Sequence, residues 1–275
     1  MPWFPEFSSA AELARREIRI AGQADPVAQY FTALNEGRTD ALEVVWPGEV
    51  VIHDPRAGVV RGHRELRTFV QDNRSWLAEH EARIETMAST VVGPRAVVEL
   101  LAHVRYDGRE VPWPMAVVAE SPDDRSVVFR TYCSQWPVDG RRHVRPPVFE
   151  PGHAEPGDVV GRHLGALASG DTESILKTFV PDGYVAEPIG PDYIHRGADE
   201  LRSFYTGTFS EGGGIGLQNC TMIDDGVRCA LEYNLIAWGT HAVPPQAGIA
   251  VYERSPDGLL TAVRIYDDVE PPDSR

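Results

Sequence analysis

Apolar residues recur at helical spacing in two separate segments of the chain. Spacing of i, i+4 and i+7 places three such residues on one helix face, and the two sets are Val27, Phe31, Leu34 and Val160, Leu164, Leu167. Gly37 and Gly170 follow them at the position where helices commonly end. We therefore predict one amphipathic helix at each place.

Both halves of the chain then turn to β-rich runs of apolar residues. The predicted strands are Ala96 to Val104, Met115 to Ala119, Ser126 to Tyr132, Val227 to Ala237, Ile249 to Glu253 and Leu260 to Tyr266. Ser121-Pro122-Asp123 and Ser255 to Gly258 have the composition of hairpin turns. Helices first and an antiparallel meander afterwards predict an α+β fold with helices packed on a curved sheet.

The chain also repeats itself. Arg61 to Phe69 recurs as Arg196 to Phe204 with six of nine positions identical, so one ancestral unit was duplicated. We predict a helical extension over 1–22 beginning behind Ser8 and Ser9, a first domain over 23–137, a Pro-rich linker over 138–157 and a second domain over 158–275. Gly212 to Gly216 lacks a strand–helix fingerprint and is predicted to be a flexible loop.

Charge and composition exclude several classes of partner. Among 275 residues, 26 Lys and Arg stand against 41 Asp and Glu, which argues against nucleic acid and anionic membranes as partners. No apolar run approaches the ~18 residues of a membrane span. Three cysteines without metal spacing and no signal segment predict a cytoplasmic protein with reduced thiols. Nine histidines without ligand spacing predict no metal, and no motif indicates a cofactor.

Two acidic residues and two tryptophans are candidates for chemistry and binding. Asp54 and Glu187 each precede a proline at the end of an apolar strand. Such an acid either bonds local turn amides or carries protons at the edge of an apolar pocket, where desolvation raises a carboxyl pKa. Trp113 and Trp238 either line a pocket mouth or cover the edge of a sheet.

The order of these short motifs resembles the ketosteroid isomerase branch of the NTF2-like superfamily, whose relatives include SnoaL-like polyketide cyclases. The resemblance is carried by Val185 to Gly190, His195-Arg196-Gly197 and Ser203-Phe204-Tyr205, and in the first repeat by Tyr30 to Gly37 and Val51 to Pro55. It implies two tandem cystatin-like cones, each closed around an apolar pocket and working without a cofactor. It also implies that the repeats pack through their sheets as an intrachain pseudo-dimer, compatible with further homo-oligomers.

Residue roles follow from the same resemblance. Asp54 and Glu187 fall on the proton-shuttle position of the family, and Tyr30 falls on the helix tyrosine that donates to the enolate oxygen. His163 occupies that helix position in the second repeat, and Tyr205 matches the tyrosine that supports it. The family's oxyanion aspartate is absent. We therefore expect the second repeat to be the better equipped. If His163 meets Glu187, a charged or at least hydrogen-bonding His163 would replace the missing acid.

Three functions are compatible with this pattern. The first is proton transfer, as isomerisation, dehydration or cyclisation, on a small apolar carbonyl-containing molecule such as a polyketide or steroid. The second is a polyether-type epoxide hydrolase or cyclase, which requires a pair of acids in one pocket. The third is a non-catalytic protein that binds a small apolar molecule.

Overall fold

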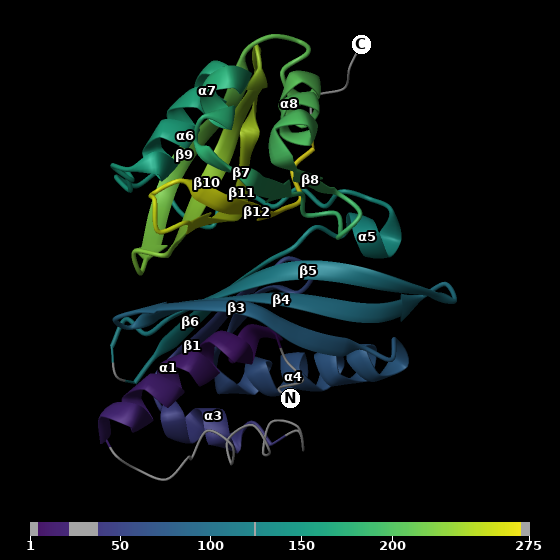
Figure 1. Ribbon diagram of the computed structural model, residues 1–275. Helices are drawn as coiled ribbons and strands as arrows, with labels where there is room; N and C mark the ends of the chain where they lie inside the picture. Colours follow the sequence, from purple (N-terminus) through teal and green to yellow (C-terminus); the bar gives the residue numbers. More distant parts are fainter. Residues whose placement is uncertain (1–4, 22–37, 124, 271–275) are drawn as a thin grey trace. The chain divides into compact units, whose positions relative to one another are not determined.

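The chain folds into two compact units, Met1–Cys133 and Ser134–Arg275 (Figure 1). The structure, a computed structural model, describes residues 5–21, 38–123 and 125–270. Each unit contains a six-stranded sheet with helices packed on it, so the predicted α+β class with two tandem domains is confirmed. The packing of the two units through their sheets stays a prediction.

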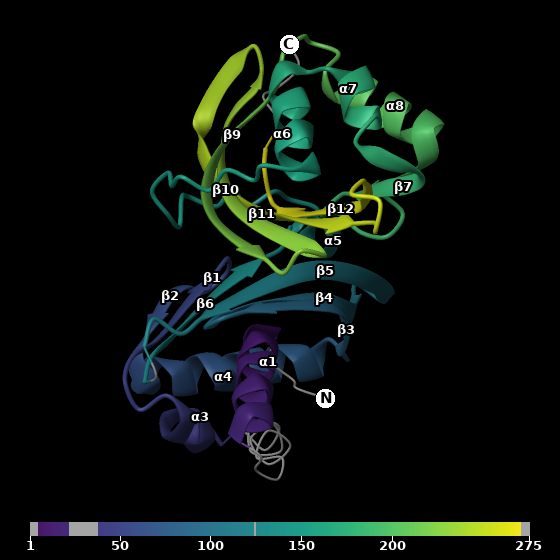
Figure 2. The same ribbon diagram turned by 60° about the vertical axis from the view of Figure 1, so that its left-hand side comes forward.

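The first unit has the strand order β2-β1-β6-β5-β4-β3, with β1 and β6 parallel and the other pairs antiparallel. Its strands are β1 (Val50–Asp54), β2 (Gly58–Arg61), β3 (Arg83–Val92), β4 (Arg95–Tyr106), β5 (Arg109–Glu120) and β6 (Val127–Tyr132). Its described helices are α1 (Pro5–Ala21), α3 (Asp40–Val45) and α4 (Gly62–Glu79). Both α1 and α4 lie on the same face of the sheet (Figures 1 and 2).

The second unit repeats this topology as β8-β7-β12-β11-β10-β9, again with one parallel pair, β7 and β12. Its strands are β7 (Phe179–Ala186), β8 (Ile194–Arg196), β9 (Gly214–Asp224), β10 (Arg228–Gly239), β11 (His241–Arg254) and β12 (Leu260–Asp267). Its described helices are α5 (Trp136–Asp139), α6 (Val159–Ser169), α7 (Thr172–Leu176) and α8 (Gly197–Thr208). The shared strand order supports the duplication inferred from the sequence.

The strand predictions are confirmed for β4, β5, β6, β10, β11 and β12, although the observed strands are mostly longer. The prediction of a flexible loop over Gly212 to Gly216 is wrong at its C-terminal end, because β9 begins at Gly214. A Cβ atom on Gly214 would lie 2.1 Å from the carbonyl oxygen of Leu167, at the end of α6. Glycine is therefore used here for close packing of a strand against a helix.

The repeated motif begins a helix in the same way in both units. Gly62 and Gly197 have φ of +71° and +77°, a conformation that residues with a Cβ atom rarely adopt. The carboxylates of Glu65 and Glu200 then accept hydrogen bonds from the backbone N–H four residues earlier, at 2.8 and 2.7 Å. This resembles a capping box, in which an acid of the first turn satisfies an N–H that the helix leaves unpaired.

The helix predicted around Val160 is confirmed as α6. The side chain of Asp158 caps it by accepting from the backbone N–H of Val160 at 2.9 Å, and Gly170 ends it with φ of +70°. The equivalent helix of the first repeat, predicted around Val27, Phe31 and Leu34, lies outside the described residues, and so does Tyr30.

Helix α1 confirms the predicted N-terminal helix but not its predicted start. It begins at Pro5, so Ser8 and Ser9 lie within the helix, where both are buried. Ser9 donates its hydroxyl to the carbonyl of Val117 on β5 instead of capping the helix. The helix packs mainly against β4 and β5 and forms part of the core of the first unit (Figure 2).

The predicted linker over 138–157 is bonded to the second unit at several points. The backbone N–H of Ala247 donates to Arg145, and that of Gly152 donates to Asn219, at 2.8 and 2.9 Å. The side-chain amide of Asn234 donates to the carbonyl of Phe149 at 2.9 Å. The segment therefore lies along strands β9, β10 and β11 of the second unit.

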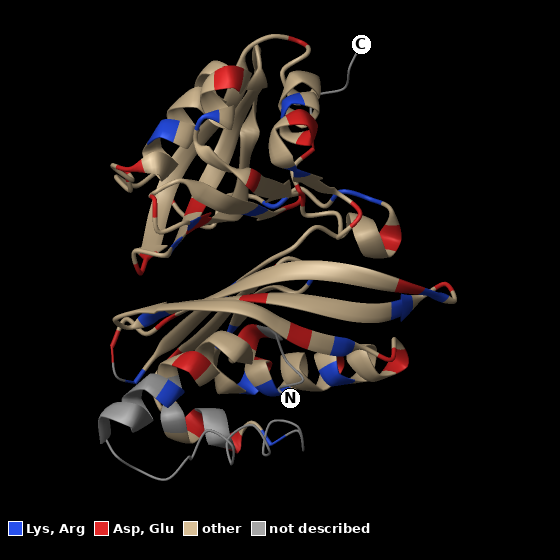
Figure 3. Ribbon diagram, viewed as in Figure 1, with Lys and Arg blue, Asp and Glu red and all other residues tan. Residues whose placement is uncertain are grey.

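Charged side chains lie both inside the sheets and at their edges, since Glu99 of β4, Arg130 of β6 and Glu232 of β10 are buried. In Figure 3 the middle of β5 is tan, whereas red and blue appear at the β4–β5 hairpin and on α4 and α8. None of the helices that the structure describes is long and apolar enough to cross a membrane. Among the described residues, no group of three or more His, Cys, Asp or Glu could hold a metal ion.

Candidate functional site

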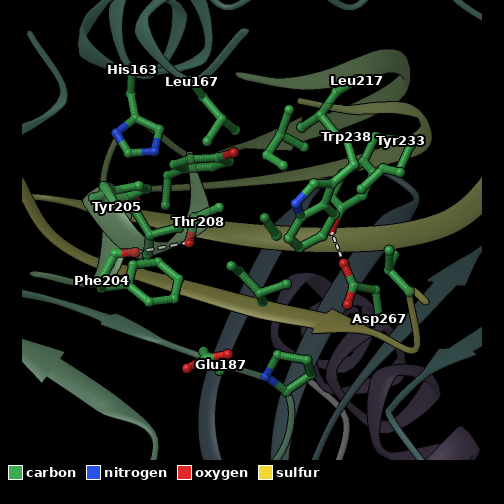
Figure 4. A pocket seen from close by; sticks show the side chains of 18 of the residues that line it. His163, Leu167, Glu187, Phe204, Tyr205, Thr208, Leu217, Tyr233, Trp238 and Asp267 are labelled. Carbon is green, nitrogen blue, oxygen red and sulfur yellow. Dashed lines mark hydrogen bonds between the residues drawn. The ribbon is translucent and has the colours of Figure 1, made fainter. Parts of the chain in front are cut away.

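The second unit encloses a cavity of about 270 Å³ between its helices and the inner face of its sheet (Figure 4). The walls are mostly apolar and come from α6, α8 and strands β9 to β12. The polar or ionisable side chains in the lining are Arg142, His163, Glu187, Tyr205, Thr208, Tyr233, Trp238, Tyr252 and Asp267. An apolar cavity with a few polar groups is the usual form of a small-molecule site.

Glu187 is held at this cavity by a histidine that sequence analysis did not single out as a site residue. Its Oε1 lies 2.7 Å from Nε2 of His195, and both side chains are about one quarter exposed. Strands β7 and β8 form a hairpin that brings the two residues together. The His195 ring stacks on Phe204 of α8 with centroids 4.3 Å apart. The carboxylate is therefore fixed in orientation while still reaching the cavity.

His163 lines the same cavity from α6, on the opposite side from Glu187 in Figure 4. Its Nδ1 lies 3.1 Å from the hydroxyl of Thr178, and burial lowers its pKa to about 4. His163 and Glu187 line one cavity, as the expectation required, but burial favours the neutral imidazole of His163, and the hydrogen-bonded partner of Glu187 is His195. Thr178 donates its hydroxyl proton to the carbonyl of Ile175, so Nδ1 of the neutral imidazole donates to Thr178 and Nε2 is left as a hydrogen-bond acceptor.

Two tyrosines present neutral hydroxyls near His163. The rings of Tyr205 and Tyr252 meet His163 edge to face, with centroids 6.2 and 5.7 Å away. Burial raises the pKa of both phenols well above the usual range, so both remain protonated. Tyr205 therefore packs beside His163, and its supporting role stays a prediction.

A second carboxyl group faces the cavity at the end of β12. Asp267 accepts a 2.6 Å hydrogen bond from the hydroxyl of Tyr233 on β10 (Figure 4). Burial raises the pKa of Asp267 to about 6, although the bond from Tyr233 and the positive charge of Arg142 oppose this shift. The cavity thus combines Glu187 with an acid whose proton exchanges close to neutral pH, a favourable property for acid–base chemistry.

The Tyr233–Asp267 hydrogen bond spans the middle strand β11 and depends on Gly248. This glycine pairs with Tyr233 on one side and with Asp267 on the other. A Cβ atom at this position would lie 2.7 Å from the Tyr233 ring and 2.8 Å from the Asp267 Cβ. A larger residue would therefore push the two side chains away from each other.

We expect Gly248→Ala to raise the pKa of Asp267 above its value of about 6. The substitution displaces Tyr233, and the hydrogen bond that favours the charged carboxylate is lost. The measurement is an NMR titration of the Asp267 carboxyl, with Tyr233→Phe as a variant that removes the same bond without crowding. An unchanged pKa in both variants would show that the bond does not control this acid.

Trp238 also lines the cavity of the second unit. This agrees with the first of its two interpretations, a pocket-lining residue, and not with cover for a sheet edge. Trp113 lies in the first unit, where it lines an inner cavity of about 20 Å³ together with Asp54, Trp76 and Glu6. That volume is near the minimum for ~1 water molecule. The two cones therefore differ, since one has room for a ligand and the other is nearly filled.

Asp54 bonds the amides of the turn that follows it, which sequence analysis gave as the alternative to a role in proton transfer. Its Oδ1 accepts the backbone N–H groups of Arg56 and Ala57, at 2.8 and 2.7 Å. It nevertheless faces the inner cavity and is buried. Val70 is buried at the position that corresponds to Tyr205 of the second unit.

The sequence pattern missed His195, Tyr233 and Asp267 as site residues. His195 had a local signal, because it lies eight positions after Glu187, a spacing compatible with a hairpin such as β7–β8. Asp267 and Tyr233 lie on different strands 34 positions apart, so only the pairing of both strands with β11 brings them together.

Comparison with protein families identifies part of the chain. Residues 27–129 match the SnoaL-like domain. The resemblance to SnoaL-like and NTF2-like proteins is thereby confirmed, and the second unit has the same strand order as the SnoaL-like repeat. No curated protein matches this sequence significantly.

Solved structures similar to the chain include several small proteins with low sequence identity. A cystatin-fold protein from Novosphingobium aromaticivorans is 15% identical, with 39% of this chain and 93% of that chain covered and a TM-score of 0.34. A candidate polyketide cyclase from Sinorhizobium meliloti is 17% identical, with 39% and 92% covered and a TM-score of 0.33. An epoxide hydrolase/cyclase-like enzyme of pyran ring formation in salinomycin is 16% identical, with 39% and 86% covered and a TM-score of 0.34.

Proposed function

We propose that the second unit is an acid–base enzyme that moves a proton on a small, apolar, carbonyl-containing molecule. The observation that carries this proposal is the oriented Glu187–His195 pair at an apolar cavity that also holds Asp267. Glu187 is the proposed base, because its carboxylate is fixed by His195 and reaches the substrate space. The cavity of about 270 Å³ suits a compact or partly inserted substrate.

In the proposed reaction, Glu187 removes a proton from the carbon next to the carbonyl group. Negative charge then develops on the carbonyl oxygen, and a hydrogen-bond donor at that point lowers the barrier. Asp267 in its protonated form is the proposed donor. Tyr205 and Tyr252 add hydroxyl donors without charge, and neutral His163 offers its Nε2 as an acceptor.

The fate of the resulting enol or enolate distinguishes the reactions of this class. Return of the proton to a different carbon is isomerisation, and loss of a β-hydroxyl as water is dehydration. Attack of the enolate carbon on a second carbonyl closes a ring. All three begin with the same proton removal, so the experiments below measure that step.

We expect the rate of this reaction to fall as the pH rises through about 6 in the wild-type protein. Below this pH Asp267 carries the proton that it donates, and above it the carboxylate cannot donate. In Asp267→Asn the amide donates at every pH, so this fall should disappear from the profile of kcat/KM against pH. A fall that persists unchanged in Asp267→Asn would assign it to another group.

Opening of an epoxide is a second candidate, and the presence of two carboxyl groups in one cavity favours it. Protonated Asp267 would donate to the epoxide oxygen, while Glu187 would remove the proton from an attacking hydroxyl or water. Sequence analysis found one acid in each repeat, whereas the structure gives this cavity two. The finding supplies the pair of acids that this alternative requires.

A panel of apolar cyclic ketones, cyclic enones and epoxides separates the candidates. In D₂O, exchange of α-protons observed by NMR supports proton transfer, and loss of epoxide supports ring opening. Tight binding of substituted phenols without either reaction supports a protein that only binds small molecules. Each readout is repeated with Glu187→Gln, because reactions at this cavity should depend on that carboxylate.

A further inference from the structure

The first unit contains a cone that its own N-terminal helix occupies. Phe7 on α1 is completely buried, and its ring meets Phe129 of β6 edge to face at 5.6 Å. The inner cavity beside Glu6 measures about 20 Å³, against about 270 Å³ in the second unit. Helix α1 thus packs on the inner face of this sheet (Figure 2).

Glu6 is the polar end of this apolar helix face. The residue is 3% exposed, and its Oε2 has no hydrogen-bond partner within the described part of the chain. A buried carboxylate without partners is costly, so the neutral acid is favoured. Burial raises the pKa of Glu6 to about 8, the negative charge of Asp54 adds to this shift, and Arg56 opposes it.

Asp54 lines the inner cavity together with Glu6. Its Oδ1 already accepts two backbone N–H groups, those of Arg56 and Ala57. Because burial favours the neutral form of Glu6, that residue presents an acidic hydroxyl beside Asp54 inside an apolar cavity. Asp54 is the first unit's counterpart of Glu187, on the same position of the repeat.

We infer that α1 is a built-in occupant of the first cone, and that the cone beneath it is a second binding site for a small apolar molecule with an acidic hydroxyl. Glu6 holds the place of that hydroxyl against Asp54. A phenol, a stable enol or a carboxylic acid has the required chemistry, and its apolar body would replace Phe7. This site is separate from the cavity of the second unit and does not depend on the function proposed there.

The walls of the cone fit such a molecule. Trp76, Trp113 and Met115 line the inner cavity. The guanidinium of Arg56 lies over both tryptophan rings, 4.5 and 5.6 Å from their centroids, and donates to Asn73 at 3.1 Å. Aromatic rings and a nearby cation suit a flat phenol.

Arg56 also marks a route into the site. Asp54, Arg56, Asn73 and Trp76 line both the inner cavity and an open groove of about 480 Å³ on the outside of the unit. These side chains form the wall between the two spaces. A change in the position of the Arg56 side chain would connect the groove with the cavity.

The ionisable groups that line the inner cavity with Glu6 are Asp54 of β1, Arg56 of the following turn and Cys133 after β6. Loss of the Glu6 proton would place two carboxylates side by side with only Arg56 to balance them. Helix α1 should therefore leave the cone more often at alkaline pH as well as in the presence of a competing hydroxyl.

The test is hydrogen exchange of the full chain measured by mass spectrometry, with 2-naphthol as the probe. At pH 7 we expect 2-naphthol to speed exchange of the amides of α1 by roughly tenfold, because it displaces the helix locally. Binding only in the second unit would protect peptides of that unit and leave α1 unchanged. That result would overturn the inference, and it would leave the function proposed for the second unit intact.

Two variants separate displacement from general loosening of the helix. Between pH 7 and 9, exchange of α1 corrected for intrinsic rates should rise in the wild type and stay flat in Glu6→Gln, which keeps a donor but has no proton to lose. Asp54→Asn should weaken the response to 2-naphthol, because the amide retains the local turn but lacks the charge. An α1 that ignores both pH and 2-naphthol in the wild type contradicts the inference without any variant.

Discussion

Replacing Glu187 by Gln should reduce α-proton exchange on a responsive ketone by about 10²–10⁴-fold, the usual contribution of a general base. Glutamine has nearly the same shape and can still bond His195, so the cavity should keep its form. It cannot accept the proton, however, and the step that starts every reaction of this class is then blocked. The measurement is the rate of deuterium incorporation by NMR in D₂O.

Two other substitutions serve as controls for this result. Glu173→Gln makes the same chemical change on the exposed surface of α7, where Glu173 pairs with Arg202 at 2.9 Å, and exchange should be unaffected. Asp54→Asn should also leave exchange unaffected, because the first cone is occupied by α1. Loss of exchange in Asp54→Asn with normal exchange in Glu187→Gln would show that the active cone is the first.

Local patterns predicted the repeat and much of the fold. Apolar spacing located α6, and the shared Arg-Gly-x-x-Glu-Leu motif revealed the repeat. This motif is the start of α4 and α8, where its Gly and Glu have local roles. The short strands β2 and β8 and the long strands β3 and β9 were missed. The first half of β3 has too few apolar residues to show the alternation of a strand. Strand β9 begins with glycines, which are typical of loops, and the sequence alone does not show the helix that packs against them.

Site residues could be predicted only where their position in the repeat matches a functional position of the family. Glu187, His163 and Tyr205 were predicted in this way, and all three line one cavity. Asp267 could not be found, because its proximity to Tyr233 arises from strand pairing across Gly248. The neutral state of His163 was equally hidden, since it depends on complete burial and not on the residue type.

The difference between the two cones was also beyond sequence reasoning. Residues 1–22 were predicted as an extension, and nothing in the pattern of α1 indicates which surface its apolar face covers. Glu6 would ordinarily be placed on the exposed side of an amphipathic helix. Its burial follows from the packing of α1 on β4 and β5, which places it at the same cavity as Asp54, a residue 48 positions later at the end of β1.

Replacing Gly214 by Ala should destabilise the second unit by about 3 kcal/mol, at the upper end of the range for overpacked sites. The new Cβ would lie 2.1 Å from the Leu167 carbonyl oxygen and 2.5 Å from the Gly170 nitrogen. Both are backbone atoms at the end of α6, so the helix itself would have to move away from β9. The loss of stability would be measured by urea unfolding, with hydrogen exchange of peptides from the second unit as the readout.

The same substitution at Gly207 is the matched control, and its expected effect has the opposite sign. Gly207 is exposed within α8, and a Cβ atom there would meet nothing within 4 Å. Alanine should therefore stabilise the helix by about 0.5–1 kcal/mol. Because α6 carries His163, Gly214→Ala should also weaken binding of small phenols in the cavity, whereas Gly207→Ala should not. Equal stability of the two variants would contradict the close helix–strand packing at Gly214.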